Sequence, residues 1–343
     1  MRKLFIISLI LSGVLSSAHG QKVGLVLSGG GARGLAHIGV IKVLEANNIP
    51  IDYITGTSMG AIIGGLYAAG YTTAEMETLF RSDEFYFWST GKIQEEYRYF
   101  FKQPEENPGW IDLKLQRREN KVKILPPTNI IPQWQMDFTF MEMMAATTAV
   151  SGGDFNKLFV PFRCIATEVH RNKQVILAKG DVGEAIRASM TFPLFFKPIK
   201  INGELLFDGG IVNNFPHDVM KETFKPDIII GSKVVPDPKT AEADDIIQQI
   251  TNMVQRPTDY DLTPEDGIML ETDVQQVGLL DFPKLDFVVE AGQKTTEALI
   301  DSIKKRIPRR VDPEELARKR ESFQARKPAL LFQNIQVEGV EDP

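Results

Sequence analysis

The chain has 343 residues, of which 43% are hydrophobic and 24% charged, a balance typical of a folded globular protein. Its formal net charge of −6 provides no electrostatic footprint for nucleic acid, so we expect no nucleic-acid partner. The single cysteine, Cys164, excludes a disulfide framework and a thiolate metal cluster, and the 4 histidines are widely separated along the chain. We therefore expect neither a metal nor another cofactor.

The first twenty residues differ in kind from the rest. Basic residues at 2–3 precede an almost unbroken apolar run over 4–14, and the small residues Ala18 and Gly20 follow it. This order is typical of a secretory signal peptide that is cleaved before Gln21. A permanent anchor is the alternative, but the apolar run is too short to span a bilayer comfortably. We expect export, and the scarcity of cysteine suits an oxidising compartment.

Alternating strand and helix patterns follow. Residues 22–27 form a short apolar run that ends at glycines, as a buried parallel strand does, and residues 35–47 carry apolar positions at helical spacing. A second strand is predicted over 51–55 and a helix of small residues over 61–69. This order predicts an α/β fold, with a parallel sheet covered by helices.

The second strand runs into a Gly-x-Ser-x-Gly turn at residues 56–60. A strand before this motif and a helix after it are the context of a nucleophile elbow. Side chains at Gly56 and Gly60 would collide with neighbouring backbone in so tight a turn, and Ser58 is left exposed at its apex. The helix that follows points its unpaired N–H groups at a charge developing there. We predict that Ser58 is the nucleophile of a serine hydrolase that cleaves acyl esters.

A second glycine-rich loop follows the first strand. It comprises Gly29, Gly30, Gly31, Ala32, Arg33 and Gly34. The loop matches a dinucleotide fingerprint in form, but Asp52 stands near the start of the next strand rather than at its end, and the Gly-Lys-Ser/Thr of a P-loop is absent. Its N–H groups can instead form an anion nest, which next to the elbow would be an oxyanion hole, together with the N–H of Met59. Arg33 either adds positive charge there or pairs with a structural carboxylate.

The general base is less obvious from the residues. His37 is interpreted as a packed helix residue and His170 as part of an exposed turn, which leaves His217 as the best of a poor set for a Ser-His-Asp triad. Asp208 ends a predicted apolar strand and is followed by two glycines, so other backbone can approach it closely. A carboxylate bonded directly to a serine can take its proton if the site is dry. The alternative is an ordinary turn-forming aspartate.

From residue 80 to about residue 150 the pattern loosens, and aromatic residues, prolines and methionines crowd the stretch. Two interpretations stay open. The stretch is either an irregular insertion with its own small core or a lid over an apolar acyl site. Further strands are predicted over 160–167 and 227–231, and helices over 182–190 and 295–305.

Together these motifs resemble the patatin-like phospholipase family. The segments that carry the resemblance are 29–34, 56–60, Asp208-Gly209-Gly210, 188–193 and 213–216. The resemblance spans residues 23–281 and implies a three-layer α/β/α fold with a mostly parallel central sheet. It also implies Ser58 as nucleophile and Asp208 as base in a dyad without histidine, with the loop 29–34 as oxyanion hole.

The resemblance further implies hydrolysis of phospholipids or other fatty acyl esters, without metal and at a membrane surface. Two alternatives remain: an acyltransferase, in which an alcohol replaces water, and an inactive binding domain with the same fold. Head-group and chain preference do not transfer, because the 80–150 stretch falls where such proteins vary most.

The expected organisation is a signal peptide over 1–20, a hydrolase domain over 21–325 and a linker over 326–343. Residues 332–339 resemble the opening strand of a periplasmic module in bacterial proteins that carry this domain ahead of an outer-membrane barrel. This resemblance implies the periplasm, outer membrane or cell surface of a Gram-negative bacterium. A homo-oligomer is also compatible with the sequence.

Overall fold

The computed structural model describes residues 20–92, 114–118, 121–125, 129–235, 249 and 256–329. Residues 1–19 of the predicted signal peptide lie outside these ranges, as do the segment 332–339 that resembles a further module and parts of the 80–150 stretch. Within the described ranges, no helix is long and apolar enough to cross a membrane.

An 8-stranded sheet forms the centre of the molecule, in the order β10-β9-β1-β2-β5-β8-β7 with β6 paired to β5. Its strands are β1 (Val23–Leu27), β2 (Tyr53–Thr57), β5 (Phe162–Glu168), β6 (Lys173–Leu177), β7 (Ile199–Ile201), β8 (Glu204–Asp208), β9 (Ile228–Lys233) and β10 (Gly267–Glu271). Neighbours from β10 to β5 run parallel, whereas β6, β7 and β8 join by antiparallel pairs. The predicted α/β fold with a mostly parallel sheet is confirmed.

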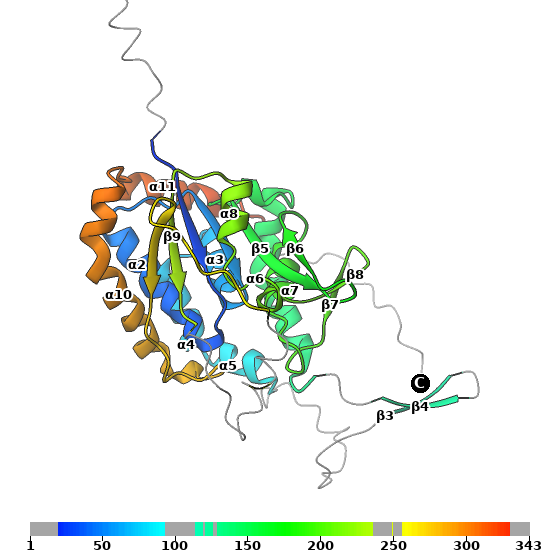
Figure 1. The fold of residues 1–343 in the computed structure, drawn as a ribbon. Coiled ribbons are helices and arrows are strands. Elements are labelled where there is room, and N and C mark those ends of the chain that lie inside the picture. Colours follow the sequence, from blue (N-terminus) through cyan, green and yellow to red (C-terminus); the bar gives the residue numbers. More distant parts are fainter. Residues whose placement is uncertain are drawn as a thin grey trace, which may run out of the picture.

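The strand β1 separates two cores. Successive residues of a strand point to opposite faces of the sheet. Accordingly, Leu25 and Leu27 join the larger buried cluster, whereas Val26 joins a smaller one with Phe215 and Met220. Met220 belongs to α8 (His217–Thr223), which Figure 1 shows on the opposite face of the sheet from α2 and α3. Helices therefore cover both faces, and the three-layer prediction is confirmed.

The larger cluster lies beneath most of the helices. They are α2 (Ala36–Ala46), α3 (Met59–Ala68), α4 (Thr73–Arg81), α5 (Asp83–Thr90), α6 (Gln133–Ser151), α7 (Val182–Ser189), α10 (Leu285–Arg306) and α11 (Pro313–Ala325). The helix α10 begins ten residues before the predicted start at 295, after a 3₁₀ turn over Phe282–Lys284 that includes Pro283. It packs so closely on α2 that a side chain at Gly39 would collide with the carbonyl of Val289.

The 80–150 stretch contributes two helices to this same cluster. Phe85 and Trp88 of α5 and Met136 and Phe140 of α6 are buried together with residues of the sheet. The helices thus build one wall of the main core and do not form a core of their own. Between them, β3 (Lys114–Arg118) and β4 (Lys121–Leu125) form a separate antiparallel hairpin.

Candidate active site

Ser58 and Asp208 meet at one edge of the sheet. Ser58 directly follows β2 and Asp208 ends β8, and β5 lies between these two strands. The hydroxyl of Ser58 donates a hydrogen bond of 2.7 Å to Oδ2 of Asp208. The structure therefore brings together the two residues that the sequence predicts to act as a pair.

The elbow holds Ser58 in an unusual backbone conformation. Its φ of 54° and ψ of −121° are strained for a residue with a side chain. The turn is tight because a Cβ at Gly56 would collide with the carbonyl of Gly60, and a Cβ at Gly60 would collide with the carbonyl of Leu27. Both glycines are thus required by close approach of backbone, as the motif predicts.

Asp208 is a buried carboxylate with few polar neighbours. Its Oδ1 accepts the N–H of Gly210 at 2.7 Å, and its Oδ2 accepts the Ser58 hydroxyl. Burial raises the pKa of Asp208 to about 6, although both hydrogen bonds act to lower it. A side chain at Gly209 would collide with the carbonyl of Ile165, so this position too needs glycine. At neutral pH Asp208 is ionised and a stronger base than an ordinary aspartate.

The loop 29–34 lies beside the elbow, but some of its N–H groups already donate hydrogen bonds to carbonyl groups of the protein. Gly29 N–H donates to the carbonyl of Asn214 at 3.1 Å, and Ala32 N–H donates to the carbonyl of Leu279 at 2.8 Å. These amides already have acceptors, so they do not match the predicted role of Gly29 and Ala32 as oxyanion donors. Gly31 has a φ of 57°, in the left-handed region that favours glycine.

Three amides remain as candidate donors to an oxyanion. Within the described residues, no acceptor is bonded to the N–H of Gly30, Gly31 or Met59. The Met59 amide stands at the first turn of α3, where no intrahelical acceptor exists. Gly34 has a different role, because a side chain there would collide with Met59 and push the loop off the elbow.

Arg33 joins the loop to a distant segment. Its Nε donates to the carbonyl of Val277 at 2.6 Å, two residues before the carbonyl that accepts from Ala32. The sequence left open whether Arg33 supplies charge or pairs structurally. This contact to the backbone makes it an anchor of the loop.

His37 is buried on α2 and holds the end of β1. Its Nε2 lies 2.8 Å from the carbonyl of Ser28, and its Nδ1 lies 2.8 Å from the hydroxyl of Ser232. A carbonyl only accepts, so Nε2 carries the proton and Nδ1 accepts from Ser232. Burial lowers the pKa of His37 to about 4, which keeps the ring neutral at physiological pH. The interpretation of His37 as a packed helix residue is confirmed.

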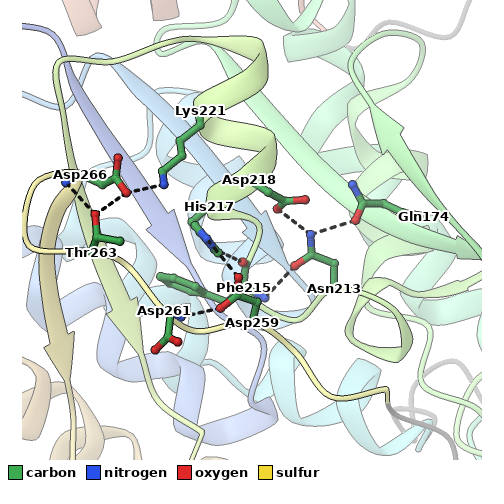
Figure 2. Close-up of polar contacts among 10 residues, drawn as sticks. All are labelled: Gln174, Asn213, Phe215, His217, Asp218, Lys221, Asp259, Asp261, Thr263 and Asp266. Atoms are coloured by element: carbon green, nitrogen blue, oxygen red, sulfur yellow. Dashed lines mark hydrogen bonds and ion pairs between the residues drawn. The ribbon is translucent and has the colours of Figure 1, made fainter.

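The other described histidines lie away from Ser58. His170 is in an exposed turn, and His217 lies 3.9 Å from Asp259 on the α8 face of the sheet. Figure 2 shows His217 in a polar cluster where Asn213 donates to both Gln174 and Asp218. This cluster braces the segment whose carbonyl groups accept from Gly29 and from Thr57.

A second support of the dyad comes from the end of α7. The hydroxyl of Ser189 accepts the N–H of Ser58 at 3.1 Å, and the carbonyl of Thr191 accepts the N–H of Asp208 at 2.8 Å. The buried Arg187 donates to the Thr191 hydroxyl at 2.6 Å and to Asp137 of α6 at 2.8 Å. The sequence did not reveal these positioning roles. Its only signal was that 188–193 resembled the family.

An apolar cavity opens directly over the dyad. It has about 720 Å³ of empty volume, is open to solvent, and has Ser58, Asp208 and Gly31 in its lining. The rest of the lining is almost entirely apolar, with aromatic side chains from α5, α6 and the segment 192–196. A cavity with this apolar lining is suited to an aliphatic chain. Among the described residues, no group of acidic, histidine or cysteine side chains is arranged to hold a metal ion.

A serine elbow at the carboxyl edge of a mostly parallel sheet is the architecture of α/β hydrolytic proteins. The family follows from comparison of the sequence with known families. The model of the patatin-like phospholipases matches residues 25–221, and the chain belongs to that family.

Curated relatives contain a similar segment within much longer chains. Lysophospholipase NTE1 of Candida glabrata is 32% identical over 217 residues, which cover 59% of this chain and 10% of that protein. Patatin-like phospholipase domain-containing protein ZK370.4 of Caenorhabditis elegans is 30% identical over 204 residues, which cover 59% of this chain and 13% of that protein. The chain therefore matches about a tenth of the length of these relatives.

Solved structures show a distant likeness. VipD from Legionella pneumophila aligns with a TM-score of 0.48 and 14% identity, covering 83% of this chain and 68% of that chain. The ExoU–SpcU complex from Pseudomonas aeruginosa aligns with a TM-score of 0.38 and 15% identity, covering 89% of this chain and 59% of that chain.

Proposed function

We propose that the protein is a lipid acyl hydrolase of the phospholipase A or esterase type, with Ser58 and Asp208 as a catalytic dyad. The observation that carries this proposal is the 2.7 Å hydrogen bond from Ser58 to a buried aspartate at the polar end of an apolar cavity. The lysophospholipase name of the Candida relative supports the choice of lipid esters as substrates.

The proposed acylation step uses the hydrogen bond between Ser58 and Asp208. Ser58 Oγ attacks the ester carbonyl carbon while Asp208 accepts the hydroxyl proton. The carbonyl oxygen becomes an oxyanion, and the N–H groups of Gly30, Gly31 and Met59 are the candidates to stabilise it. When the intermediate collapses, the bond to the alcohol oxygen breaks, and Asp208 returns its proton to that oxygen. An acyl-enzyme on Ser58 and a free alcohol result.

Deacylation repeats the sequence with water. Asp208 accepts a proton from a water molecule whose oxygen attacks the acyl carbon, and the second tetrahedral intermediate collapses with departure of the Ser58 oxygen. The serine regains its proton from Asp208, and the fatty acid leaves. The raised pKa of Asp208, to about 6, suits this double role because the group must both accept and release a proton near neutral pH.

Substitution of Ser58 tests the proposal. We expect Ser58→Ala to abolish hydrolysis of nitrophenyl acyl esters and to prevent labelling by a fluorophosphonate probe. The matched control is Ser89→Ala, because Ser89 lines the same cavity without contacting Asp208, and it should retain both activities. Turnover by Ser58→Ala would refute the dyad. Absence of labelling in the parent protein would favour the inactive binding domain, and product analysis with an added lipid alcohol would detect acyl transfer.

We also propose that residues 1–20 direct export, on the basis of their sequence alone. N-terminal sequencing of the protein from its native cell should then begin at Gln21. Retention of Met1 in the mature protein would refute this proposal.

A further inference from the structure

The helix α6 carries an apolar stripe on its exposed side. Trp134, Phe138 and Met141 follow one another at helical spacing and are 53%, 58% and 37% exposed. On the side facing the core, Met136 and Phe140 are buried and line the cavity over the dyad. One helix thus presents apolar side chains both to the cavity and to the surface.

Neighbouring segments extend this surface. Ile130, just before α6, is 73% exposed, and its N–H donates to the carbonyl of Leu194, which is itself 48% exposed. Leu194 lies between Phe192 and Phe195, and both of these residues line the cavity. Single exposed apolar side chains are common on soluble proteins, but a group of large ones on neighbouring segments is typical of a surface that meets a partner or a membrane. We call the surface formed by Ile130, Trp134, Phe138, Met141 and Leu194 the α6 face.

We infer that the α6 face docks on a lipid bilayer and places the cavity mouth against it. This inference rests on the proposed function, because a substrate with long acyl chains resides in a bilayer. The occupant follows from continuity, since the elements that expose these side chains are the same elements that line the acyl cavity. A tryptophan among aliphatic and aromatic neighbours is also typical of a segment that lies at a membrane interface.

The charges of α6 define the kind of bilayer. The helix contains Asp137 and Glu142 but no lysine or arginine, so it offers no cationic attraction to anionic head groups. Asp137 is paired with Arg187 in the protein. Docking is therefore driven by insertion of apolar side chains, and neutral phosphatidylcholine suffices as the surface.

Sedimentation with phosphatidylcholine vesicles tests the inference on the full chain. The measurement uses a Ser58→Ala background, so that no substrate is consumed and the result does not depend on the proposed chemistry. We expect Trp134→Gln/Phe138→Gln to weaken vesicle binding by on the order of 100-fold, roughly tenfold for each half-exposed aromatic side chain withdrawn from the bilayer. Ile130→Gln, outside the helix, should weaken binding in the same direction.

The matched control is Ile176→Gln/Leu205→Gln. These residues are 41% and 42% exposed on β6 and β8 and do not line the cavity. We expect this control to bind vesicles within about twofold of the parent, since it removes apolar surface that does not meet the bilayer. With Ser58 restored, the α6 variant should lose hydrolysis of vesicle lipid in parallel with binding, while its turnover of a water-soluble short-chain ester stays unchanged.

Several results would overturn the inference. Vesicle binding by Trp134→Gln/Phe138→Gln equal to that of the parent is one of them. Another is a parent protein that light scattering shows to be a dimer, together with a Trp134→Gln/Phe138→Gln variant that is a monomer and binds vesicles unchanged. The α6 face would then contact a second copy of the chain. Binding that requires anionic lipid and disappears at high salt would contradict the apolar mode. Loss of activity in Ser58→Ala concerns only the proposed function.

Discussion

Two aspartates on opposite faces of the sheet show how surroundings set the chemistry of one side chain. Asp208 lies in the apolar cavity, where burial raises its pKa to about 6. Asp266 lies in the polar cluster of Figure 2, where hydrogen bonds from Lys221 and Thr263 lower its pKa. The same carboxyl group thus has a raised pKa in the apolar cavity and a lowered pKa where it accepts hydrogen bonds from Lys221 and Thr263.

Replacement of the two carboxylates should separate these roles most strongly. We expect Asp208→Asn to lower kcat by on the order of 10⁴-fold, since an amide cannot accept the Ser58 proton. Asp266→Asn should leave kcat within about twofold, because surface substitutions away from a site have small effects. The measurement is kcat for ester hydrolysis by both variants. Equal decreases in kcat would contradict the separate roles of the two aspartates.

The pH dependence should reflect the same contrast. As the proposed base, Asp208 must be ionised to accept the Ser58 proton, so kcat/KM should fall about tenfold per pH unit below its pKa of about 6. Its contribution to stability has the opposite sign. The folded state binds the proton more tightly than the unfolded state, so the free energy of unfolding should decrease by about 3 kcal/mol as pH rises from about 4 to about 6.

Denaturant unfolding across this pH range measures that decrease, and Asp208→Asn should remove it. The pKa of Asp266 is lowered, so its stabilisation is present above the ordinary aspartate pKa and is lost as pH falls through the lowered value. If Asp208→Asn retains some turnover, its activity should no longer fall below about pH 6. An unchanged acid limb in that variant would show that another group titrates there.

Removal of the Ser189 hydroxyl should have an intermediate effect. Ser189→Ala leaves the N–H of Ser58 without its acceptor, and a buried orphan donor costs about 1–3 kcal/mol, or roughly 10–100-fold if the loss falls on the transition state. We expect the loss in kcat with little change in KM. Ser151→Ala is the control, because Ser151 is also buried and its hydroxyl donates to the carbonyl of Thr148 in the same helix. Equal kinetics in the two variants would exclude a positioning role for Ser189.

His37→Gln should have the smallest effect. A glutamine amide can still donate toward the Ser28 carbonyl, so we expect a decrease in kcat of a few-fold at most. Because the pKa of His37 is about 4, the acid limb of the pH profile near 6 should keep its midpoint in this variant. A shifted midpoint would mean that histidine titration controls the limb.

Local motifs were sufficient to predict the central parts of the site. The turn at 56–60 and the strand end at Asp208 could be identified because their signals are local. Each consists of a predicted strand followed directly by glycines in the sequence. Their direct contact could not be derived from either motif alone. It depended on a resemblance to a family, since β5 lies between the two strands in the sheet.

The supporting contacts escaped prediction because they join residues that are far apart in the sequence. Ser189 lies 131 positions from Ser58, and no local pattern marks its hydroxyl as an acceptor. Gly29 and Ala32 were predicted as donors because a glycine loop has many free amides, but carbonyl groups of Asn214 and Leu279 bind them. The start of α10 lies ten residues before the predicted one, although its first turns bury Leu285, Val288, Val289 and Gly292 at helical spacing.

The contacts that hold the glycine loop limit where the chain can be shortened or joined to another protein. The family match ends at residue 221, yet Arg33 and Ala32 are held by carbonyl groups of Val277 and Leu279. A shortened protein or a chimera that breaks the chain after 221 would keep Ser58 and Asp208 but lose the backbone that anchors the glycine loop beside them. The smallest unit that holds the candidate site intact therefore reaches at least to residue 279, well past residue 221, where the family match ends.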